Sequence, residues 1–344
     1  MKHKAGIEKR VLAALLCAVV LIGLVATSIA GIAYASEVDT GRTGSVTFRL
    51  DQTPSDYNTA INDLRAWLQS HPDSGLEIRL HHVADVDGGG AYAGTPDFTG
   101  LKGLGDIGPD TKAAEWEALA AEAMKLAAKR TPEKTGTAGY ADLTGGMLFE
   151  HLPLGLYLVD IADLNAGNDS YSFVPYLVVV PGFDAGGGRL YDVEAGLKPM
   201  KSDRTGSLVI RKALPECRVE NYGSTFVFEV KAVKNDKVVY NDVHSIVFKE
   251  HGVKELRIDG IPAGSTVTVT EVYSGSCYEA DQPEKTVTVQ PDEAAAAEFR
   301  NTYDDGAPRN GASAVNRMTA GKNDGGAMTL EWERQAASPS VVKN

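Results

Sequence analysis

The sequence is poor in cysteine, in aromatic residues and in basic residues. Only three of its 344 residues are cysteines, so disulfides are not the main source of stability in a chain this long. The 34 basic residues are outnumbered by 46 acidic ones, and a net charge of -12 argues against a nucleic-acid binder, which needs a basic surface. Aromatic residues make up 7% and glycines number 36, which together with many Thr/Val runs favours β-rich modules over helical bundles.

The N-terminal 35 residues have the composition of an export signal. A basic start is followed by an uncharged stretch of 25 residues, Val11–Ala35, which ends in the small-x-small sequence Ala33-Tyr34-Ala35. We therefore expect cleavage after Ala35 and a secreted or cell-surface location. The stretch is also long enough to span a bilayer, so an uncleaved anchor is the alternative and the one membrane contact that the sequence predicts.

Cleavage would change both the charge and the thiol content. It removes four basic residues and one acidic residue, which leaves 30 basic against 45 acidic residues and a net charge of -15. It also removes Cys17, so only Cys217 and Cys277 remain and only one intramolecular disulfide is possible. Cys217 lies five residues past Lys212 and Cys277 six past Glu271. If the two strands that carry Lys212 and Glu271 leave the same end of the fold, a Cys217–Cys277 disulfide follows.

An internal repeat predicts two related modules. The segment 42–50, RTGSVTFRL, reappears at 204–212 as RTGSLVIRK, and both copies read as a strand entered from a Thr-Gly turn. A second pair, FEHLPLG at 149–155 and IDGIPAG at 258–264, precedes a later strand in each copy. We place the modules at 41–202 and 203–303, followed by a flexible tail at 304–344.

The first module is the larger because it carries helical insertions. Thr53-Pro54-Ser55-Asp56 is typical of a helix start, and apolar residues follow at helical spacing until His71-Pro72. A second helix is expected from about 111 to 129. The expected strands are 76–83, 156–161, 173–180 and 190–195.

The second module reads as an all-β sandwich without a long helix. Its expected strands are about 206–212, 225–233, 237–240, 245–249, 254–258, 265–273 and 285–290, with 296–301 closing the fold. In the tail, Met328, Leu330 and Trp332 alternate with polar residues after an Asn-Asp-Gly turn, which is a weak hairpin signal.

Three polar residues of the second module occupy inward positions. Because side chains alternate along a strand, Lys212 shares a face with Leu208 and Ile210, Glu271 with Val267 and Val269, and Asn301 with Phe299. An unpaired buried charge costs several kcal/mol, so these three groups must compensate one another. The alternative is that each is a strand-end residue with its polar group in water.

A lysine, a glutamate and an asparagine in one core are the components of a spontaneous Lys–Asn isopeptide bond. Burial lowers a lysine pKa, so the amine of Lys212 can be a neutral nucleophile. A buried carboxyl group favours its protonated form, so Glu271 is expected to polarise the carbonyl of Asn301 and to shuttle protons. Attack by Lys212 then releases ammonia and joins the first and last strands.

The residues that carry this chemistry resemble a known family. Gly206–Lys212, the segment from Ile261 to Glu271, and 299–303 (FRNTY) resemble the collagen-adhesin B-type (prealbumin-like) modules of Gram-positive pilins and surface adhesins. Residues 44–200 look like the N-terminal-side domain of pilin subunits. The resemblance implies a mainly β protein of two tandem immunoglobulin-like or prealbumin-like β-sandwich modules, and it maps the isopeptide chemistry of the family onto Lys212, Glu271 and Asn301.

The sequence departs from that family in three places. In the first module Leu50 stands at the lysine position, so we predict no isopeptide bond there. Polymerising pilins usually have a lysine after a proline at the end of this domain, where this chain reads Lys198-Pro199-Met200-Lys201; Lys198 or Lys201 is the candidate for an intermolecular link. There is also no LPxTG-like pentapeptide, so we expect a chain that is not wall-anchored by itself, a truncated sequence, or attachment through the N-terminal segment.

Metal and catalytic motifs are weak. His81 and His82 are adjacent on a strand and point to opposite faces, so they do not chelate together, and Asp85-x-Asp87-Gly88 lacks the glutamate of a calcium loop. No cofactor is expected.

The leading hypothesis is therefore a non-enzymatic exported structural subunit, pilin-like or adhesin-like, with other surface subunits and host or matrix ligands as partners. The alternative is a secreted module that binds carbohydrate or host protein without polymerising. A secreted enzyme is a third and weaker hypothesis, because no catalytic set is present. For assembly, the strand around Met328–Trp332 is a candidate to add to the sheet edge of a neighbouring subunit.

Overall fold

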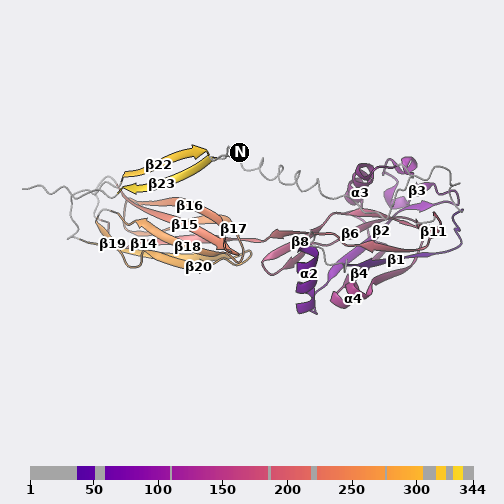
Figure 1. Cartoon of the computed structure of the whole chain (residues 1–344), viewed down its shortest axis with the longest axis horizontal. Coiled ribbons are helices and arrows are strands. Elements are labelled where there is room, and N and C mark those ends of the chain that lie inside the picture. Colours follow the sequence, from indigo (N-terminus) through magenta and orange to yellow (C-terminus); the bar gives the residue numbers. More distant parts are fainter. Residues whose placement is uncertain are drawn as a thin grey trace, which may run out of the picture. The chain divides into compact units, whose positions relative to one another are not determined.

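The structure, a computed structural model, describes residues 37–50, 59–108, 111–184, 187–217, 223–275, 277–304, 315–322 and 328–335. The predicted export signal and the predicted helix cap at Thr53–Asp56 lie outside these residues. The chain divides into two compact units, residues 1–202 and 203–344. Most of the described residues are in strands, which confirms the mainly β fold class (Figure 1).

The first unit is built on two main sheets. One has the order β12-β1-β5, and its β1 strand is the first copy of the repeated segment. The other has the order β3-β2-β6-β9, with β4 also paired to β2. The bounds of these strands are β1 Gly44–Arg49, β2 Leu76–Val86, β3 Tyr92–Gly94, β4 Lys134–Ala138, β5 Met147–Leu152, β6 Gly155–Ile161, β9 Tyr176–Val180 and β12 Asp192–Gly196.

Smaller elements complete the first unit. Among the described residues of this unit they are a sheet of order β13-β8-β7, a ribbon of β10 and β11, three α-helices and two 3₁₀ helices. Their bounds are β7 Leu164–Ala166, β8 Asp169–Phe173, β10 Gly182–Phe183, β11 Arg189–Leu190, β13 Pro199–Asp203, α2 Thr59–Ser70, α3 Ala113–Ala127, α4 Tyr140–Gly145, η2 Pro96–Phe98 and η3 Leu104–Asp106.

The helices cover two different hydrophobic clusters. Helix α2 buries Ile61, Leu64 and Leu68, which belong to the cluster that also contains Phe48 of β1. Helix α3 buries apolar residues in a separate cluster with Leu156 of β6 (Figure 1). The two helices predicted from periodicity are therefore confirmed. The region 173–180 forms two strands instead of the one predicted, because Pro175 has no backbone N–H to donate and interrupts the pairing.

The second unit is a β-sandwich of two four-stranded sheets, ordered β17-β14-β21-β19 and β16-β15-β18-β20 (Figure 1). Between them lies a cluster of buried apolar side chains that includes Leu208, Phe228, Val269 and Phe299. The strand bounds are β14 Thr205–Leu214, β15 Ser224–Lys234, β16 Lys237–Phe248, β17 Gly252–Pro262, β18 Thr266–Tyr273, β19 Tyr278–Ala280, β20 Glu284–Thr288 and β21 Ala294–Tyr303.

Two differences from the predicted strands have a simple cause. The two predicted strands 237–240 and 245–249 form one continuous strand, β16, which ends at Phe248, because the turn-forming residues Asn241 and Asp242 stay paired with Lys231 and Val230 of β15. The short strand β19 is not among the predicted strands, since its three residues carry no recognisable alternation.

The first and last strands of this sandwich are neighbours. Strand β14 pairs in parallel with β21 from Ser207↔Ala294 to Ala213↔Arg300, and antiparallel with β17 on its other side. On the solvent face the guanidinium of Arg211 forms ion pairs with Glu255 of β17 at 2.8 Å and with Glu298 of β21 at 3.0 Å. The parallel pairing fixes which residues of the two strands stand level with each other.

The tail contains a hairpin. Strands β22, Val315–Lys322, and β23, Met328–Gln335, pair antiparallel along their whole length and form a two-stranded sheet of their own. No helix in the described part of the chain is long and apolar enough to cross a membrane.

Candidate functional site

Lys212, Glu271 and Asn301 all lie in the interior of the second unit. Lys212 is on β14, Glu271 on β18 and Asn301 on β21, so the two sheets face each other across these side chains. Lys212 and Asn301 are fully buried and Glu271 is 6% exposed. The alternation of burial along β18 and β21 points the neighbouring Thr270 and Arg300 outward. These are interior groups and not strand ends in water.

The three side chains contact one another directly. The Nζ of Lys212 lies 2.8 Å from Oε1 and 2.9 Å from Oε2 of Glu271, and it also donates to Oδ1 of Asn301. The Nδ2 of Asn301 donates to Oε1 of Glu271 at 2.7 Å. One carboxylate oxygen, Oε1, is therefore within hydrogen-bond distance of both nitrogens.

This arrangement differs in one respect from the expectation. The sequence predicts that Glu271 polarises the carbonyl of Asn301, whereas its carboxylate contacts the carboxamide nitrogen, and it is the amine of Lys212 that contacts Oδ1. A second acceptor for Nδ2 is the backbone carbonyl oxygen of Ser274, at 3.1 Å. Each polar atom of the Asn301 side chain thus has a partner of the complementary kind.

Aromatic rings surround the amine. The Nζ of Lys212 lies 4.7 Å from the ring centroid of Phe226 and 5.8 Å from that of Phe228, both on β15. Burial among these groups lowers the pKa of Lys212, although its hydrogen bond with Glu271 acts in the opposite direction. The sequence analysis missed both phenylalanines, although their inward phase on a strand opposite β14 was a usable signal.

The first unit has no equivalent of this triad at its repeat position. Leu50, which occupies the lysine position of the repeat, is buried in the main hydrophobic cluster of that unit. This buried leucine side chain has no amine that could act as a nucleophile.

The two candidate lysines for an intermolecular link have different surroundings. Lys198 is exposed and immediately precedes β13. Lys201 lies within β13, and its Nζ is 2.7 Å from Asp63 and 3.0 Å from Asp169. Burial disfavours the charged form of Lys201, but the hydrogen bonds with the two aspartates outweigh it and raise its pKa. Both lysines are exposed, and they differ in that the amine of Lys201 is paired with two carboxylates.

Cys217 and Cys277 are both free cysteines in the structure, so the predicted disulfide is not formed in it and stays a prediction. The Sγ of Cys217 lies 4.0 Å from Oγ of Ser224, which donates to Oη of Tyr278 at 3.2 Å. Cys277 is the chain neighbour of Tyr278. The two thiols therefore belong to the same region of the sandwich.

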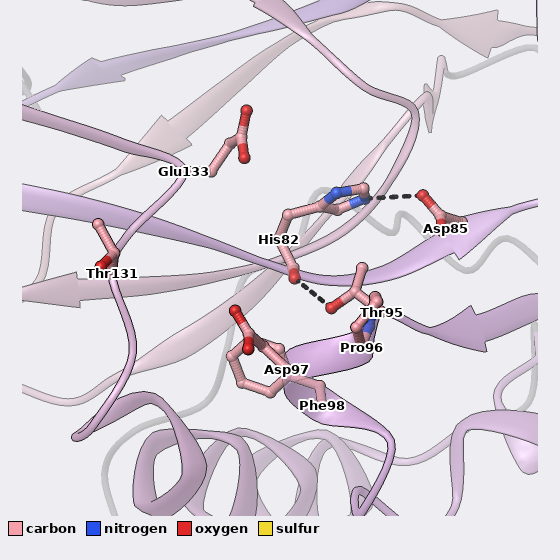
Figure 2. A pocket seen from close by; sticks show the side chains of 8 residues that line it. All are labelled: His82, Asp85, Thr95, Pro96, Asp97, Phe98, Thr131 and Glu133. Atoms are coloured by element: carbon pink, nitrogen blue, oxygen red, sulfur yellow. Dashed lines mark hydrogen bonds and ion pairs between the residues drawn. The ribbon is translucent and has the colours of Figure 1, made fainter.

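One pocket of the first unit lies beside His82 and has a volume of about 350 Å³ (Figure 2). The imidazole of His82 stacks on Tyr157 and lies 3.5 Å from Asp85, while Asp97 and Glu133 also line the pocket. The neighbouring His81 is buried and lies edge-on to Phe98. Within the described residues, no group of three or more His, Cys, Asp or Glu side chains is arranged to hold a metal ion.

Comparison with known proteins gives one family match. A family model described as a domain of unknown function (DUF5979) matches residues 209–304, which is the sandwich from β14 to β21. No curated protein matches the chain.

Solved structures that are similar to this chain include pilins and adhesins of Gram-positive bacteria. The minor pilin GBS52 of Streptococcus agalactiae is 16% identical over 76% of this chain and 96% of that chain, with a TM-score of 0.23. The major pilin SpaD of Corynebacterium diphtheriae is 11% identical over 78% of this chain and 99% of that chain, with a TM-score of 0.26.

A third structure is the major pilin SpaA of Corynebacterium diphtheriae, 11% identical over 75% of this chain and 100% of that chain, with a TM-score of 0.24. Its structure points to a modular pilus assembly with stabilising isopeptide bonds. With scores this low, the function proposed for the present chain rests on its own residues.

Proposed function

We propose that the protein is an exported structural subunit of a Gram-positive cell surface, pilin-like or adhesin-like, whose second unit is locked by a self-formed isopeptide bond between Lys212 and Asn301. The observation that carries the proposal is the position of Oε1 of Glu271, at 2.8 Å from the Lys212 nitrogen and 2.7 Å from the Asn301 carboxamide nitrogen. A carboxyl oxygen in contact with both nitrogens can take a proton from one and give it to the other.

The reaction needs only the atoms of the three side chains. In the neutral form of the pair the proton is on Glu271, and the free amine of Lys212 attacks Cγ of Asn301. A new C–N bond forms as the carboxyl group takes a proton from the attacking nitrogen and delivers one to Nδ2. The bond from Cγ to Nδ2 then breaks and ammonia leaves. An amine and a carboxamide become a secondary amide and ammonia, and the atoms balance without any oxidant or reductant.

The surroundings support this chemistry. The lowered pKa of Lys212 makes its neutral amine accessible, and the fully buried site excludes competing water. Proximity supplies the rest, because the nucleophile already touches the carboxamide that it attacks. The link connects the first strand of the sandwich to the last. Tension applied to the two ends of the chain is therefore carried by a covalent bond and not by the hydrogen bonds of the sheet.

The test is the intact mass of the purified mature protein. We expect the wild-type chain to be lighter than its sequence mass by one ammonia, and the variants Lys212→Ala, Glu271→Gln and Asn301→Ala to have their full sequence masses. Glu298→Gln, an exposed change on the same strand as Asn301, is the matched control and should keep the loss. A wild-type chain at full mass contradicts the proposal.

The mature N-terminus read in the same spectrum tests cleavage after Ala35.

Assembly with other subunits is the partner role that fits such a protein. Hairpin β22–β23 forms a two-stranded sheet of its own, and an isolated two-stranded hairpin is marginally stable in water. We propose that it gains stability by adding to the sheet edge of a neighbouring subunit. Deletion of residues 304–344 should then abolish oligomers measured by light scattering, and an unchanged mass distribution would count against this role.

A further inference from the structure

The turn after β18 contacts the proposed reaction site through its backbone. Strand β18 ends at Tyr273, and the carbonyl oxygen of the next residue, Ser274, accepts the 3.1 Å hydrogen bond from Nδ2 of Asn301. Among the described residues, this contact is the one polar interaction of the Asn301 carboxamide that does not involve Lys212 or Glu271.

The orientation of that carboxamide decides which of its two ends Glu271 can protonate. With Nδ2 beside Glu271, the carboxyl group can protonate the nitrogen that leaves. If the carboxamide were rotated by half a turn, Oδ1 would face Glu271 and the leaving nitrogen would face the attacking amine. The orientation seen in the structure therefore places the leaving nitrogen where Glu271 can protonate it directly.

Glu271 cannot fix this orientation by itself. A carboxylate only accepts hydrogen bonds, but a protonated carboxyl group also donates, so during proton transfer Glu271 is compatible with either end of the carboxamide. The Ser274 carbonyl can only accept at every stage, and it therefore selects the N–H end. A rotated carboxamide would place two carbonyl oxygens against each other and lose this hydrogen bond.

Gly275 sets the direction of that carbonyl. Its φ of +82° lies in the left-handed region that glycine adopts without steric cost. A Cβ at this position would lie 2.9 Å from Cδ2 of Tyr278 and 3.4 Å from Cε1 of Phe226. Any other residue at position 275 would therefore have to shift the backbone or one of these rings, and a shift of the backbone would turn the peptide between Ser274 and Gly275.

We propose that Gly275 is a positioning residue of the isopeptide reaction, which acts by aiming the Ser274 carbonyl at Nδ2 of Asn301. The inference rests on the proposed function, since it assigns a role within that reaction. It goes further by naming the element that selects one of two carboxamide orientations.

The experiment follows bond formation over time. Full-length chain is made by cell-free synthesis, and the fraction that has lost one ammonia is measured by intact mass at successive times. Gly275→Ala should slow the loss about tenfold, the rate equivalent of one hydrogen bond. Gly260→Ala is the matched control, because Gly260 also has a positive φ, +78°, but no atom lies within 4 Å of its Cβ position. We expect that control to react at the wild-type rate.

A second background separates orientation from general packing. In Asn301→Asp the two carboxyl oxygens are interchangeable and the bond forms with loss of water, so Gly275→Ala should leave the rate of that reaction unchanged. Circular dichroism of each variant establishes that the chain is folded. Should the alanine variant not fold, Gly275→Asn supplies the same comparison, because asparagine tolerates positive φ better than alanine.

The outcomes are distinct. A wild-type chain that never loses ammonia contradicts the proposed function. A wild-type chain that does so, with equal rates for Gly275→Ala and Gly260→Ala, leaves the bond in place and overturns the positioning role. Equal slowing by Gly275→Ala in the wild-type and Asn301→Asp backgrounds also overturns it, because the effect would then be one of packing.

Discussion

The side chains of Lys212 and Asn301 are 89 positions apart in the sequence and share a hydrogen bond in the core of one sandwich. The parallel register explains how they meet. Lys212 stands level with Phe299 on the neighbouring strand, and Asn301 lies two residues further along, at the same inward phase. Because β14 and β21 are adjacent, the two side chains need to cross only the space between neighbouring strands.

Loss of the proposed cross-link should destabilise the second unit strongly. Asn301→Ala leaves the Lys212–Glu271 ion pair in place and removes the carboxamide that forms the bond, together with its hydrogen bonds to Glu271 and Ser274. In the wild type, closure of a loop of about 90 residues limits the entropy of the unfolded chain and so stabilises the fold. Asn301→Ala loses this effect, so its free energy of unfolding should be lower than that of the wild type by about 4–5 kcal/mol. Urea denaturation of the full chain, with pulse proteolysis to detect the second unit, measures it.

The control for that measurement is Glu298→Ala on the same strand. It removes one exposed ion pair with Arg211, and such pairs contribute about 0–1 kcal/mol. Similar losses for the two variants would show that Asn301 carries no covalent link.

Lys198, before β13, should react faster than Lys201 within that strand. Both residues are exposed, but Nζ of Lys201 lies between Asp63 and Asp169, which raise its pKa, so less of its amine is in the neutral, nucleophilic form. Brief acetylation at pH 8 followed by peptide mapping should modify Lys198 first. Asp63→Asn should raise the labelling of Lys201 and leave that of Lys198 unchanged. Preferential labelling of Lys201 in the wild type would reverse the assignment.

The two cysteines of the mature chain should form a disulfide after export. Their surroundings meet at Ser224 and Tyr278, and export delivers the chain to an oxidising compartment. We expect no free thiol when the secreted protein is titrated in denaturant, and a Cys217–Cys277 peptide in a non-reducing digest. Closure of a loop of about 60 residues would add about 4 kcal/mol of stability. Two thiols per chain in the titration would refute the pairing.

The first unit should lose stability in mild acid because of His81. This side chain is 4% exposed, and its buried Nδ1 has no hydrogen-bond partner among the described residues. Burial lowers the pKa of His81 below its ordinary value of 6.5, while the nearby carboxylate of Asp160 opposes the shift. The unfolded chain therefore binds a proton at a higher pH than the folded chain does. Stability is retained above about pH 6.5 and decreases as the pH falls below that value.

Urea midpoints at pH 7.5 and pH 5 test this dependence. His81→Phe should reduce the difference between the two midpoints, whereas the exposed His71→Gln should leave it at the wild-type size. An unaltered difference in His81→Phe would assign the acid sensitivity to other groups.

Strand phase alone allowed much of the site to be predicted. The alternation of Val267, Val269 and Glu271, and of Phe299 and Asn301, specifies inward positions from the sequence because the side-chain period of a strand is two. For the first module it was the alignment of the repeat, with Leu50 at the lysine position, that predicted the absence of an isopeptide bond. What phase cannot give is which strands are neighbours, and only the parallel register of β14 and β21 brings Lys212 to Asn301.

The orientation of the carboxamide was beyond the reach of the sequence. The orientation depends on the backbone carbonyl of Ser274. Because every residue type has a backbone carbonyl, no sequence motif predicts this contact. Gly275 offered only the ordinary signal of a turn, and the rings that a Cβ there would meet, those of Phe226 and Tyr278, lie on the separate strands β15 and β19. The same limit applied to Asn241 and Asp242, whose turn propensity was overridden by continuous pairing with β15.

The parallel neighbours β14 and β21 also bear on how such chains grow during evolution. Because the first and last strands, β14 and β21, are parallel, the polypeptide enters the sandwich at one end and leaves it at the opposite end. A duplicated gene segment can therefore be appended after Tyr303 without disturbing either copy. The number of modules in a lineage is then free to vary by duplication and loss, while the interior of each module is inherited intact.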